Sequence, residues 1–200
     1  MRPRSYRLQQ RQAGMDATRA RIVAAARAVL GGGDSFSIEA VAREARVARL
    51  TVYDRFGTRE ALLEAVFDDL AASGGLMRLP EAFTEADPIA GLERFVAIFC
   101  GFYSTHRLVL RRLHALEVLG RGVAAESDRN DRRLQGLRVL LGRVASVGHP
   151  DSGTDLVART VHALTSFAFI DELAGEDADP AGVVPQIVAL VKAAAHLDDA

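Results

Sequence analysis

The chain is poor in cysteine, tryptophan and lysine, and it has no long apolar run. Its 200 residues include one cysteine, one lysine and no tryptophan. Cys100 therefore has no partner for an internal disulfide, and we expect the protein to work in a reducing compartment, the cytoplasm. No segment approaches the roughly eighteen uninterrupted apolar residues of a membrane span, and residues 1–11 are basic rather than apolar. The sequence thus predicts neither a membrane span nor a secretory signal.

Sequence signatures of the common enzyme classes are also absent. The chain has no Gly-x-Ser-x-Gly nucleophile motif, no phosphate-binding glycine loop followed by Lys-Ser/Thr, and no dinucleotide-binding glycine pattern. Cys100, His106 and His114 are too widely spaced for one metal ion, because eight residues of a straight helix rise by ~12 Å. We therefore expect no catalytic residue, no metal site and no cofactor.

The abundant residue types predict an all-α protein. Hydrophobic residues make up 49% of the chain, Ala, Leu and Arg are abundant, and no strand-like alternation persists. This length and composition suffice for one small domain and one larger domain. We expect about nine helices, and those of the C-terminal part are predicted near residues 88–105, 107–119, 123–147, 154–173 and 181–197.

The charges divide unevenly along the chain. Residues 1–60 contain twelve arginines and six acidic residues, a balance of +6. Residues 61–200 contain thirteen basic and twenty acidic residues, a balance of −7, which restores the total of −1. A basic segment joined to an acidic one is typical of a nucleic-acid-binding domain fused to a domain with another role. Taken alone, the asymmetry is equally compatible with a random split of solvated charges.

Residues 36–67 begin with the pattern of a short, half-buried helix. Its apolar residues follow the i, i+3, i+4, i+7 spacing of one helix face: Ile38, Val41, Ala42 and Ala45. Ser37 precedes this stripe and is placed to cap the helix.

A second short helix is predicted after a turn at residues 46–48. Only Val52 and Phe56 supply an apolar stripe, and the rest of the surface consists of arginine, hydroxyl and phenol groups. A helix of this kind suits an anionic partner, as in a helix-turn-helix motif with its second helix in a DNA major groove. The residues predicted to contact DNA are Arg43, Arg46, Arg49, Thr51, Tyr53, Asp54, Arg55, Thr58 and Arg59. Among them Thr51, Asp54 and Arg55 are assigned to base edges, and the others to phosphates or to a helix N-terminus that can meet one.

This stretch resembles the N-terminal domain of TetR-family transcriptional regulators over residues 16–67. The matching features are a helix over residues 18–30, the Phe-Ser-Ile-x-x-Val-Ala run from Phe36, the Thr-Val-Tyr-x-x-Phe helix from Thr51, and the Thr-Arg-Glu-Ala-Leu-Leu run from Thr58. The resemblance implies that the hydroxyl of Tyr53 contacts a backbone phosphate. It also implies a helix-turn-helix domain at residues 16–60 and a helical effector-binding and dimerisation domain at residues 61–200. Residues 1–15 are expected to form a flexible basic arm, with Asp16 capping the first helix.

Two positions depart from the family pattern. Arg46 and Leu50 both stand where the family commonly carries glycine. If position 46 requires a positive φ, arginine costs on the order of 1 kcal/mol there relative to glycine. Leu50 is expected to lengthen the apolar contact of the second helix.

Aromatic residues concentrate in the middle of the larger domain. We predict an apolar effector pocket, with an ordinary hydrophobic core as the alternative for each position. Its residues would be Phe95, Phe99, Phe102, Tyr103, His106, Leu110, His114 and Phe167. The resemblance favours the pocket, because TetR-family regulators hold their inducer between the middle helices of this domain. The expected effector is an apolar or aromatic small molecule.

The last two predicted helices are more apolar than one packed face requires. We therefore predict a homodimer through a four-helix interface, and the resemblance implicates the same helices. The interface residues would be Leu164, Phe167, Ile187, Leu190 and Val191.

Together these features predict a homodimeric DNA-binding transcriptional regulator, a repressor that leaves a pseudo-palindromic operator in double-stranded DNA when a ligand binds. One alternative is a soluble helical enzyme or ligand-binding protein with an incidentally basic N-terminal domain. Another is a regulator without a ligand, whose larger domain would be filled rather than hollow.

Overall fold

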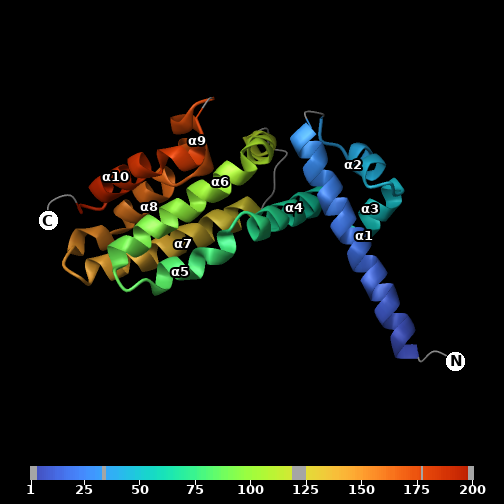
Figure 1. The fold of residues 1–200 in the computed structure, drawn as a ribbon, viewed down its shortest axis with the longest axis horizontal. Coiled ribbons are helices and arrows are strands. Elements are labelled where there is room, and N and C mark those ends of the chain that lie inside the picture. Colours follow the sequence, from blue (N-terminus) through green and yellow to red (C-terminus); the bar gives the residue numbers. More distant parts are fainter. Residues whose placement is uncertain (1–3, 33–34, 119–124, 177, 198–200) are drawn as a thin grey trace. The chain divides into compact units, whose positions relative to one another are not determined.

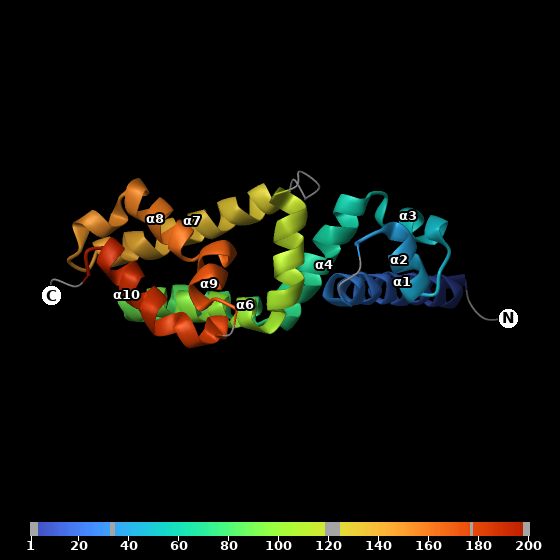
Figure 2. The ribbon, with the colours of Figure 1, turned by 90° about the horizontal axis from the view of Figure 1, so that it is seen from above.

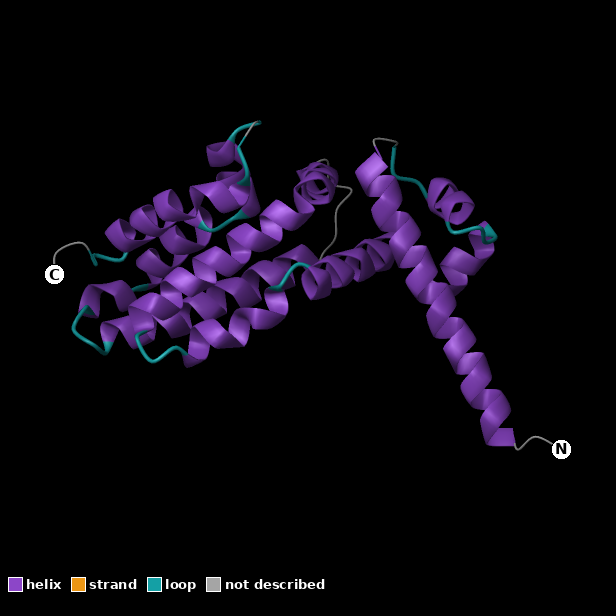
Figure 3. Cartoon of the chain, viewed as in Figure 1, coloured by secondary structure: helices purple, strands orange, loops and turns teal. Residues whose placement is uncertain are grey.

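The computed structural model describes residues 4–32, 35–118, 125–176 and 178–197. Over these residues the protein is helical throughout, with ten α-helices and three short 3₁₀ helices (Figure 3). The predicted all-α class is confirmed. None of the helices in the described part of the chain is both long and apolar enough to cross a membrane.

The chain divides into two compact units. The first contains the described residues up to Asp69 together with the segment that starts at Arg111, and the second contains Leu70–Leu110 and the described residues from Ala125 onward. The expected boundary at residues 60–61 stays a prediction, and it lies within the helix that runs without a break from Arg59 to Ser73.

The first unit is built from four helices: α1 (Arg4–Gly32), α2 (Ile38–Glu44), α3 (Arg49–Phe56) and most of α4 (Arg59–Ser73). Each contributes fully buried apolar side chains, which together form a small core: Ile22, Ala26 and Leu30 of α1, Val41 of α2, Val52 of α3, and Leu62, Leu63 and Val66 of α4. This core holds α2 and α3, the predicted helix-turn-helix pair, on the longer α1 and α4.

Helix α1 begins earlier than predicted. It starts at Arg4, so the expectation of an arm without secondary structure over residues 1–15 is wrong for the described part of that segment. Asp16 lies within the helix, where its Oδ1 accepts a hydrogen bond from Gln12 Nε2 at 3.2 Å. Residues 4–15 contain three arginines and three glutamines, whose high helix propensity explains the extension.

The second unit contains the remaining helices: η1 (Leu76–Arg78), α5 (Leu79–Thr84), α6 (Pro88–Val118, of which Arg111–Val118 belongs to the first unit), α7 (Ala125–Ala145), η2 (Pro150–Gly153), α8 (Asp155–Leu164), α9 (Phe167–Ala174), η3 (Pro180–Val183) and α10 (Val184–Ala194). Within this unit α6, α7, α8 and α10 run alongside one another (Figure 1 and Figure 2). Their buried faces form a core of aromatic, leucine and valine side chains.

Four predicted helices differ from the observed ones. The helices expected at 88–105 and 107–119 are a single α6 with a kink at His106, where φ is −121° and ψ is 17°. The helix expected at 154–173 is two helices, because Thr165 ends α8 and Ser166 caps α9 by accepting a hydrogen bond from the Phe169 N–H. The final helix starts at Val184, with Pro185 in its first turn, where no N–H donor is needed.

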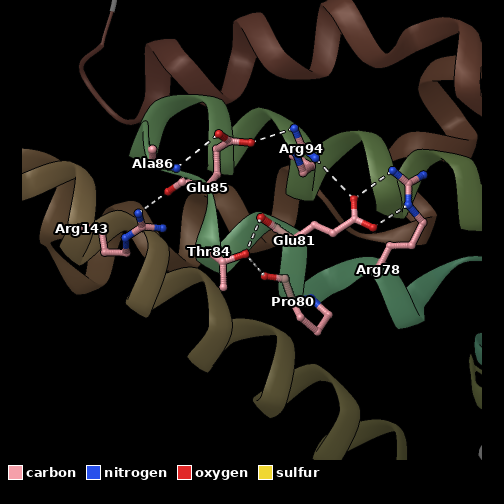
Figure 4. Close-up of polar contacts among 8 residues, drawn as sticks. All are labelled: Arg78, Pro80, Glu81, Thr84, Glu85, Ala86, Arg94 and Arg143. Carbon is pink, nitrogen blue, oxygen red and sulfur yellow. Dashed lines mark hydrogen bonds and ion pairs between the residues drawn. The ribbon is translucent and has the colours of Figure 1, made fainter.

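Helix α5 lies in a segment where no helix was predicted. It is fixed to α6 and α7 by polar contacts (Figure 4). Glu81 accepts hydrogen bonds from Arg78 at 3.0 Å and from Arg94 of α6 at 3.4 Å. Arg143 of α7 donates to the carbonyl oxygens of Phe83, at 2.8 Å, and of Glu85. These contacts, rather than the intrinsic propensity of a six-residue segment, account for the helix.

Candidate nucleic-acid interface

Helix α2 and the turn after it have the local geometry that the sequence predicts. The Ser37 side chain accepts a hydrogen bond from the Ala40 N–H at 3.1 Å, which satisfies one of the unpaired donors at the start of α2. In the turn, Arg46 has a φ of 53°, in the left-handed region. Arginine at this position therefore costs on the order of 1 kcal/mol relative to glycine. The Arg46 side chain is exposed and available to a ligand.

Helix α3 buries two residues and exposes most of its polar side chains. Val52 and Phe56 are buried, as predicted, whereas Arg49, Tyr53 and Asp54 are exposed. Ala48 precedes the helix and has no side-chain acceptor, so the first N–H groups of α3 are left for solvent or a ligand. A short helix with an uncapped N-terminus and a polar outer face is suited to contact phosphate groups.

Arg49 and Tyr53 form one preorganised pair on this face. Arg49 donates from Nη2 to the Tyr53 hydroxyl at 3.3 Å, and its Cζ lies 5.5 Å from the centroid of the Tyr53 ring. It also forms an ion pair with Glu39 of α2, with 2.5 Å between Nη1 and Oε1. The hydrogen bond to Tyr53 and the charge of Glu39 raise the pKa of the Arg49 guanidinium above its usual value. Arg49 thus carries a fixed positive charge and limits the positions of the Tyr53 ring.

The start of α4 is capped by Thr58. Thr58 Oγ1 accepts a hydrogen bond from the Ala61 N–H at 3.0 Å, and the Thr58 side chain is exposed. Arg59 is half-buried, and its Cζ lies 5.1 Å from the Phe36 ring centroid. Arg43 is exposed on α2, whereas Thr51 of α3 is half-buried.

Two residues of α3 lie differently from what the sequence predicted. Arg55, assigned to a base edge, is half-buried, and its Nε atom is enclosed without a hydrogen-bond acceptor among the described groups. Leu50, expected to join the apolar contact, is 70% exposed. The helical repeat explains this position, because 100° per residue places Leu50 about 200° away from Val52.

A contact from α1 supports the end of α3. Arg19 donates to the backbone oxygen of Arg55 at 3.2 Å, and its Cζ lies 4.4 Å from the Phe56 ring centroid. The sequence contained no signal for this role, because Arg19 and Arg55 are 36 positions apart and no local spacing joins them.

Comparison with known families identifies this unit. Residues 22–66 match the model of the family described as bacterial regulatory proteins, tetR family. Residues 22–66 are the DNA-binding region of a TetR-family transcriptional regulator. The TetR family is a family of DNA-binding, non-enzymatic regulators, which agrees with the predicted absence of a catalytic function.

Two solved structures share the fold of this TetR-family protein. A TetR-like transcriptional regulator from Rhodococcus sp. RHA1 aligns with a TM-score of 0.65 and 21% sequence identity, over 87% of this chain and 93% of the other. A TetR transcriptional regulator from Streptomyces coelicolor aligns with a TM-score of 0.53 and 26% identity, over 86% of this chain and 95% of the other. No curated protein sequence matches significantly.

Most of the predicted pocket residues of this TetR-family protein lie together in the second unit. Their rings form a chain of contacts, with centroid distances of 4.8 Å for Phe95–Phe99, 5.8 Å for Phe99–Tyr103, 5.6 Å for Phe102–Tyr103 and 5.4 Å for Tyr103–Phe167. We call these five residues the aromatic chain.

The histidines predicted for the pocket lie at different places. His106 is 3% exposed, its ring centroid lies 5.6 Å from that of Phe102, and its Nε2 is 3.4 Å from Ser73 Oγ. Leu110 is also buried in the second unit. His114, however, belongs to the first unit, so the structure does not group it with the aromatic chain.

The single cysteine lies buried in α6, next to the aromatic chain in sequence. Cys100 is fully buried, and burial raises the pKa of its thiol to about 11, so the thiol is protonated at neutral pH. In the described part of the chain, no three His, Cys, Asp or Glu side chains are arranged to hold a metal ion.

The residues predicted for the dimer interface divide between the core and the surface. Ile187 and Val191 are buried within the single chain, so they cannot form the outer surface of α10. Leu164 and Phe167 are half-buried, and Leu190 is 41% exposed. Leu156 of α8 was not among the predicted interface residues, although its side chain is 68% exposed.

Proposed function

We propose that this TetR-family protein is a homodimeric repressor of the cytoplasm that binds a pseudo-palindromic operator in double-stranded DNA and is released by an apolar or aromatic small molecule. The main support for the proposal is the outer face of α3. There the pair of Arg49 and Tyr53 adjoins the tight turn that carries the exposed Arg46.

The residues of this face divide by the part of DNA that they suit. Arg43, Arg46 and Arg49 are exposed cations, and Tyr53 presents a hydroxyl beside Arg49, so these four suit phosphate contacts. Leu50, near the start of the helix, offers an apolar surface of the kind that packs on a thymine methyl group.

Two copies of this face are needed to read a two-fold symmetric operator. A dimer places two recognition helices on successive half-sites and sums their binding energies. Leu156 of α8 and Leu190 of α10 are exposed leucines on helices that pack against one another in the second unit. This exposed apolar surface supports α8 and α10 as the region of dimer contact.

Release by a ligand requires two states of the protein that bind the ligand with different affinity. The aromatic chain supports the second unit as the site of that ligand. Its rings pack on one another, so a ligand must separate them or replace one of their contacts, and either event changes the packing of α6 against α9. Each tenfold difference in ligand affinity between the two states contributes about 1.4 kcal/mol toward release.

Selection of bound duplexes from a random DNA pool tests the proposal. We expect the full-length protein to enrich an inverted repeat of two half-sites, with an affinity that falls steeply as salt rises. Enrichment of a single half-site would contradict the dimer, and no enrichment at all would contradict operator binding. A variant with Arg46, Arg49 and Tyr53 changed to Ala, checked for native helicity, serves as the control that removes the proposed phosphate contacts.

A further inference from the structure

In the second unit, two side chains donate hydrogen bonds to the same backbone oxygen. The acceptor is the carbonyl oxygen of Thr165, which ends α8 and is fully buried. The Tyr103 hydroxyl of α6 donates to it at 3.2 Å, and Arg133 of α7 donates to it from Nη1. One neutral donor and one cationic donor thus point at a single oxygen at the end of a helix, which carries a partial negative charge.

The Arg133 guanidinium has no anionic group among its direct contacts in the described part of the chain. Its other contacts are His162 Nε2, 2.9 Å from Nη2, the amide oxygen of Asn130, 3.5 Å from Nη2, and the face of Phe99, 5.8 Å from Cζ. None of these described groups is anionic. His162, Asn130 and the Thr165 carbonyl each accept one of the five guanidinium N–H groups. Two N–H groups remain for another acceptor.

Other arginines of the second unit show the contrast. Arg107 also donates to backbone oxygens near the end of a helix, α9, but its Nε lies 2.5 Å from the Asp171 carboxylate. Arg138, on the same helix as Arg133, pairs with Asp155 at 2.6 Å. A partly buried arginine without a carboxylate costs stability, and a bound anion would offset that cost.

His162 does not supply the missing negative charge, nor is it a second cation. Burial, and then the charge of Arg133, lower the pKa of the His162 imidazole to about 4. The Asn130 backbone and the Asp131 carboxylate act in the opposite direction without cancelling this shift. At neutral pH the imidazole is therefore uncharged and can accept a hydrogen bond from Arg133.

We propose that the effector of this regulator is an aromatic or apolar carboxylic acid, whose carboxylate binds Arg133 and the Tyr103 hydroxyl at the place now held by the Thr165 carbonyl. Its apolar part lies along Phe99, Tyr103 and Phe167 of the aromatic chain. A guanidinium is the side chain best suited to a carboxylate, because it donates two parallel hydrogen bonds. The inference rests on the proposed function and names the chemical class of its ligand.

The other interpretation of Arg133 is structural. An arginine at the C-terminus of α8 stabilises the helix end by its charge alone. In that case Arg133 would affect protein stability but would not distinguish an acid from its uncharged analogue. Ligand selectivity therefore separates the two interpretations, whereas a loss of stability does not.

The test compares two acids with their amides on the full chain. The probes are 3-phenylpropanoate and octanoate, and the matched controls are 3-phenylpropanamide and octanamide. Binding is followed at neutral pH by the histidine ring resonances in NMR spectra. We expect each acid to bind about tenfold or more tightly than its amide, because hydrogen bonds to a charged group are the stronger ones. We also expect a bound acid, unlike a bound amide, to raise the pKa of His162.

Variants assign the selectivity to one side chain. Arg133→Gln should remove the preference for acids, and Arg133→Lys should retain part of it. Arg138→Gln removes one positive charge from the same helix and should leave the preference unchanged. If Arg133→Gln does not fold, the acid–amide comparison and the His162 titration in the unaltered protein still distinguish the two interpretations of Arg133.

Three results would overturn the inference. Equal binding of acids and amides would exclude the carboxylate site but leave an uncharged apolar effector in place. Selectivity that persists in Arg133→Gln would assign the acid to another residue. Binding of none of the four probes up to their solubility would contradict the carboxylate site, because neither acid would then be recognised. Operator binding is measured separately by DNA selection, so it can fail or hold independently of these three results.

Discussion

At the scale of single residues, Tyr53 shows how one side chain can have two roles on the DNA-binding face. Its ring lies beside the Arg49 guanidinium, and its hydroxyl accepts a hydrogen bond from that group. The hydroxyl keeps its own hydrogen for another acceptor, and in the proposed complex this acceptor is a phosphate oxygen. The ring and the hydroxyl can therefore be tested separately.

Tyr53→Phe should weaken operator binding by roughly 1 kcal/mol, about fivefold, because one phosphate hydrogen bond is lost while the ring remains. The affinity is measured by fluorescence anisotropy with the best duplex from the selection. Thermal unfolding should be nearly unchanged, since Tyr53 lies at the surface. An unaltered affinity in a folded variant would remove Tyr53 from the phosphate contacts.

His162 predicts a pH dependence of stability. Its pKa is about 4 in the folded protein and near 6.5 when unfolded, so the unfolded chain binds more protons between these values. The contribution of the neutral imidazole to stability is complete above pH 6.5 and is lost as the pH falls toward 4. Urea unfolding at pH 7 and pH 5 should show a smaller loss of stability in His162→Gln than in the unaltered protein. The same loss in both would show that other groups cause the acid sensitivity.

At the scale of helices, the kink of α6 at His106 coincides with a close approach of the chain after α4. Gly74 lies so near that a Cβ added to it would be 2.5 Å from Phe102 Cδ2 and 2.7 Å from the His106 ring. Two side chains on the aromatic face of α6 thus require a residue without a side chain at position 74.

Gly74→Ala should destabilise the second unit by about 1–3 kcal/mol, because the methyl group forces buried rings to shift. Gly142→Ala is the matched control, since Gly142 is exposed on α7 and a Cβ there meets nothing within 4 Å. That substitution should be neutral or stabilising by up to about 1 kcal/mol. Both are measured by chemical denaturation, and equal effects would contradict the close contact at Gly74.

The sequence predicted helices best where the local signals were strong. Ser37 was recognised as a cap, and the spacing of Val52 and Phe56 identified the buried side of α3. The break between α8 and α9 was missed, because Thr165 and Ser166 are compatible with a helix interior and only their hydrogen bonds end it. The start of α1 was missed because charged residues without an apolar period were interpreted as an arm.

Parts of the candidate sites depend on contacts between distant residues, and these could not be read from spacing. Arg19 reaches Arg55 across 36 positions, and Arg133 reaches His162 and Thr165 across about thirty. Ile187 and Val191 followed the pattern of an apolar stripe, but a stripe does not say whether its partner is the same chain or another copy. Only the packed structure distinguishes the two.

At the scale of the whole molecule, the two compact units allow DNA binding and self-association to be altered independently. The predicted DNA contacts belong to the first unit, and the exposed leucines of α8 and α10 belong to the second. A substitution at those leucines should change the oligomeric state without changing the local structure of the DNA-binding face.

Leu156→Arg should convert dimers to monomers, because it places a charge in an interface that excludes water. The side chain is 68% exposed in the single chain, so the substitution should not unfold the protein. Leu108→Arg is the control, since Leu108 is 55% exposed on α6, outside the proposed interface. Sedimentation equilibrium measures both variants, and a dimer that survives Leu156→Arg would place the contact elsewhere.

The burial of Cys100 gives the second unit an internal reporter of its own motions. The chain has one thiol, and that thiol is inaccessible and protonated in the folded state. A thiol reagent can therefore react only during excursions that open the core around α6, and its rate measures how often these excursions occur. An effector that closes this core should slow the labelling, and one that loosens it should speed the labelling, without any dye or engineered residue near the DNA-binding face.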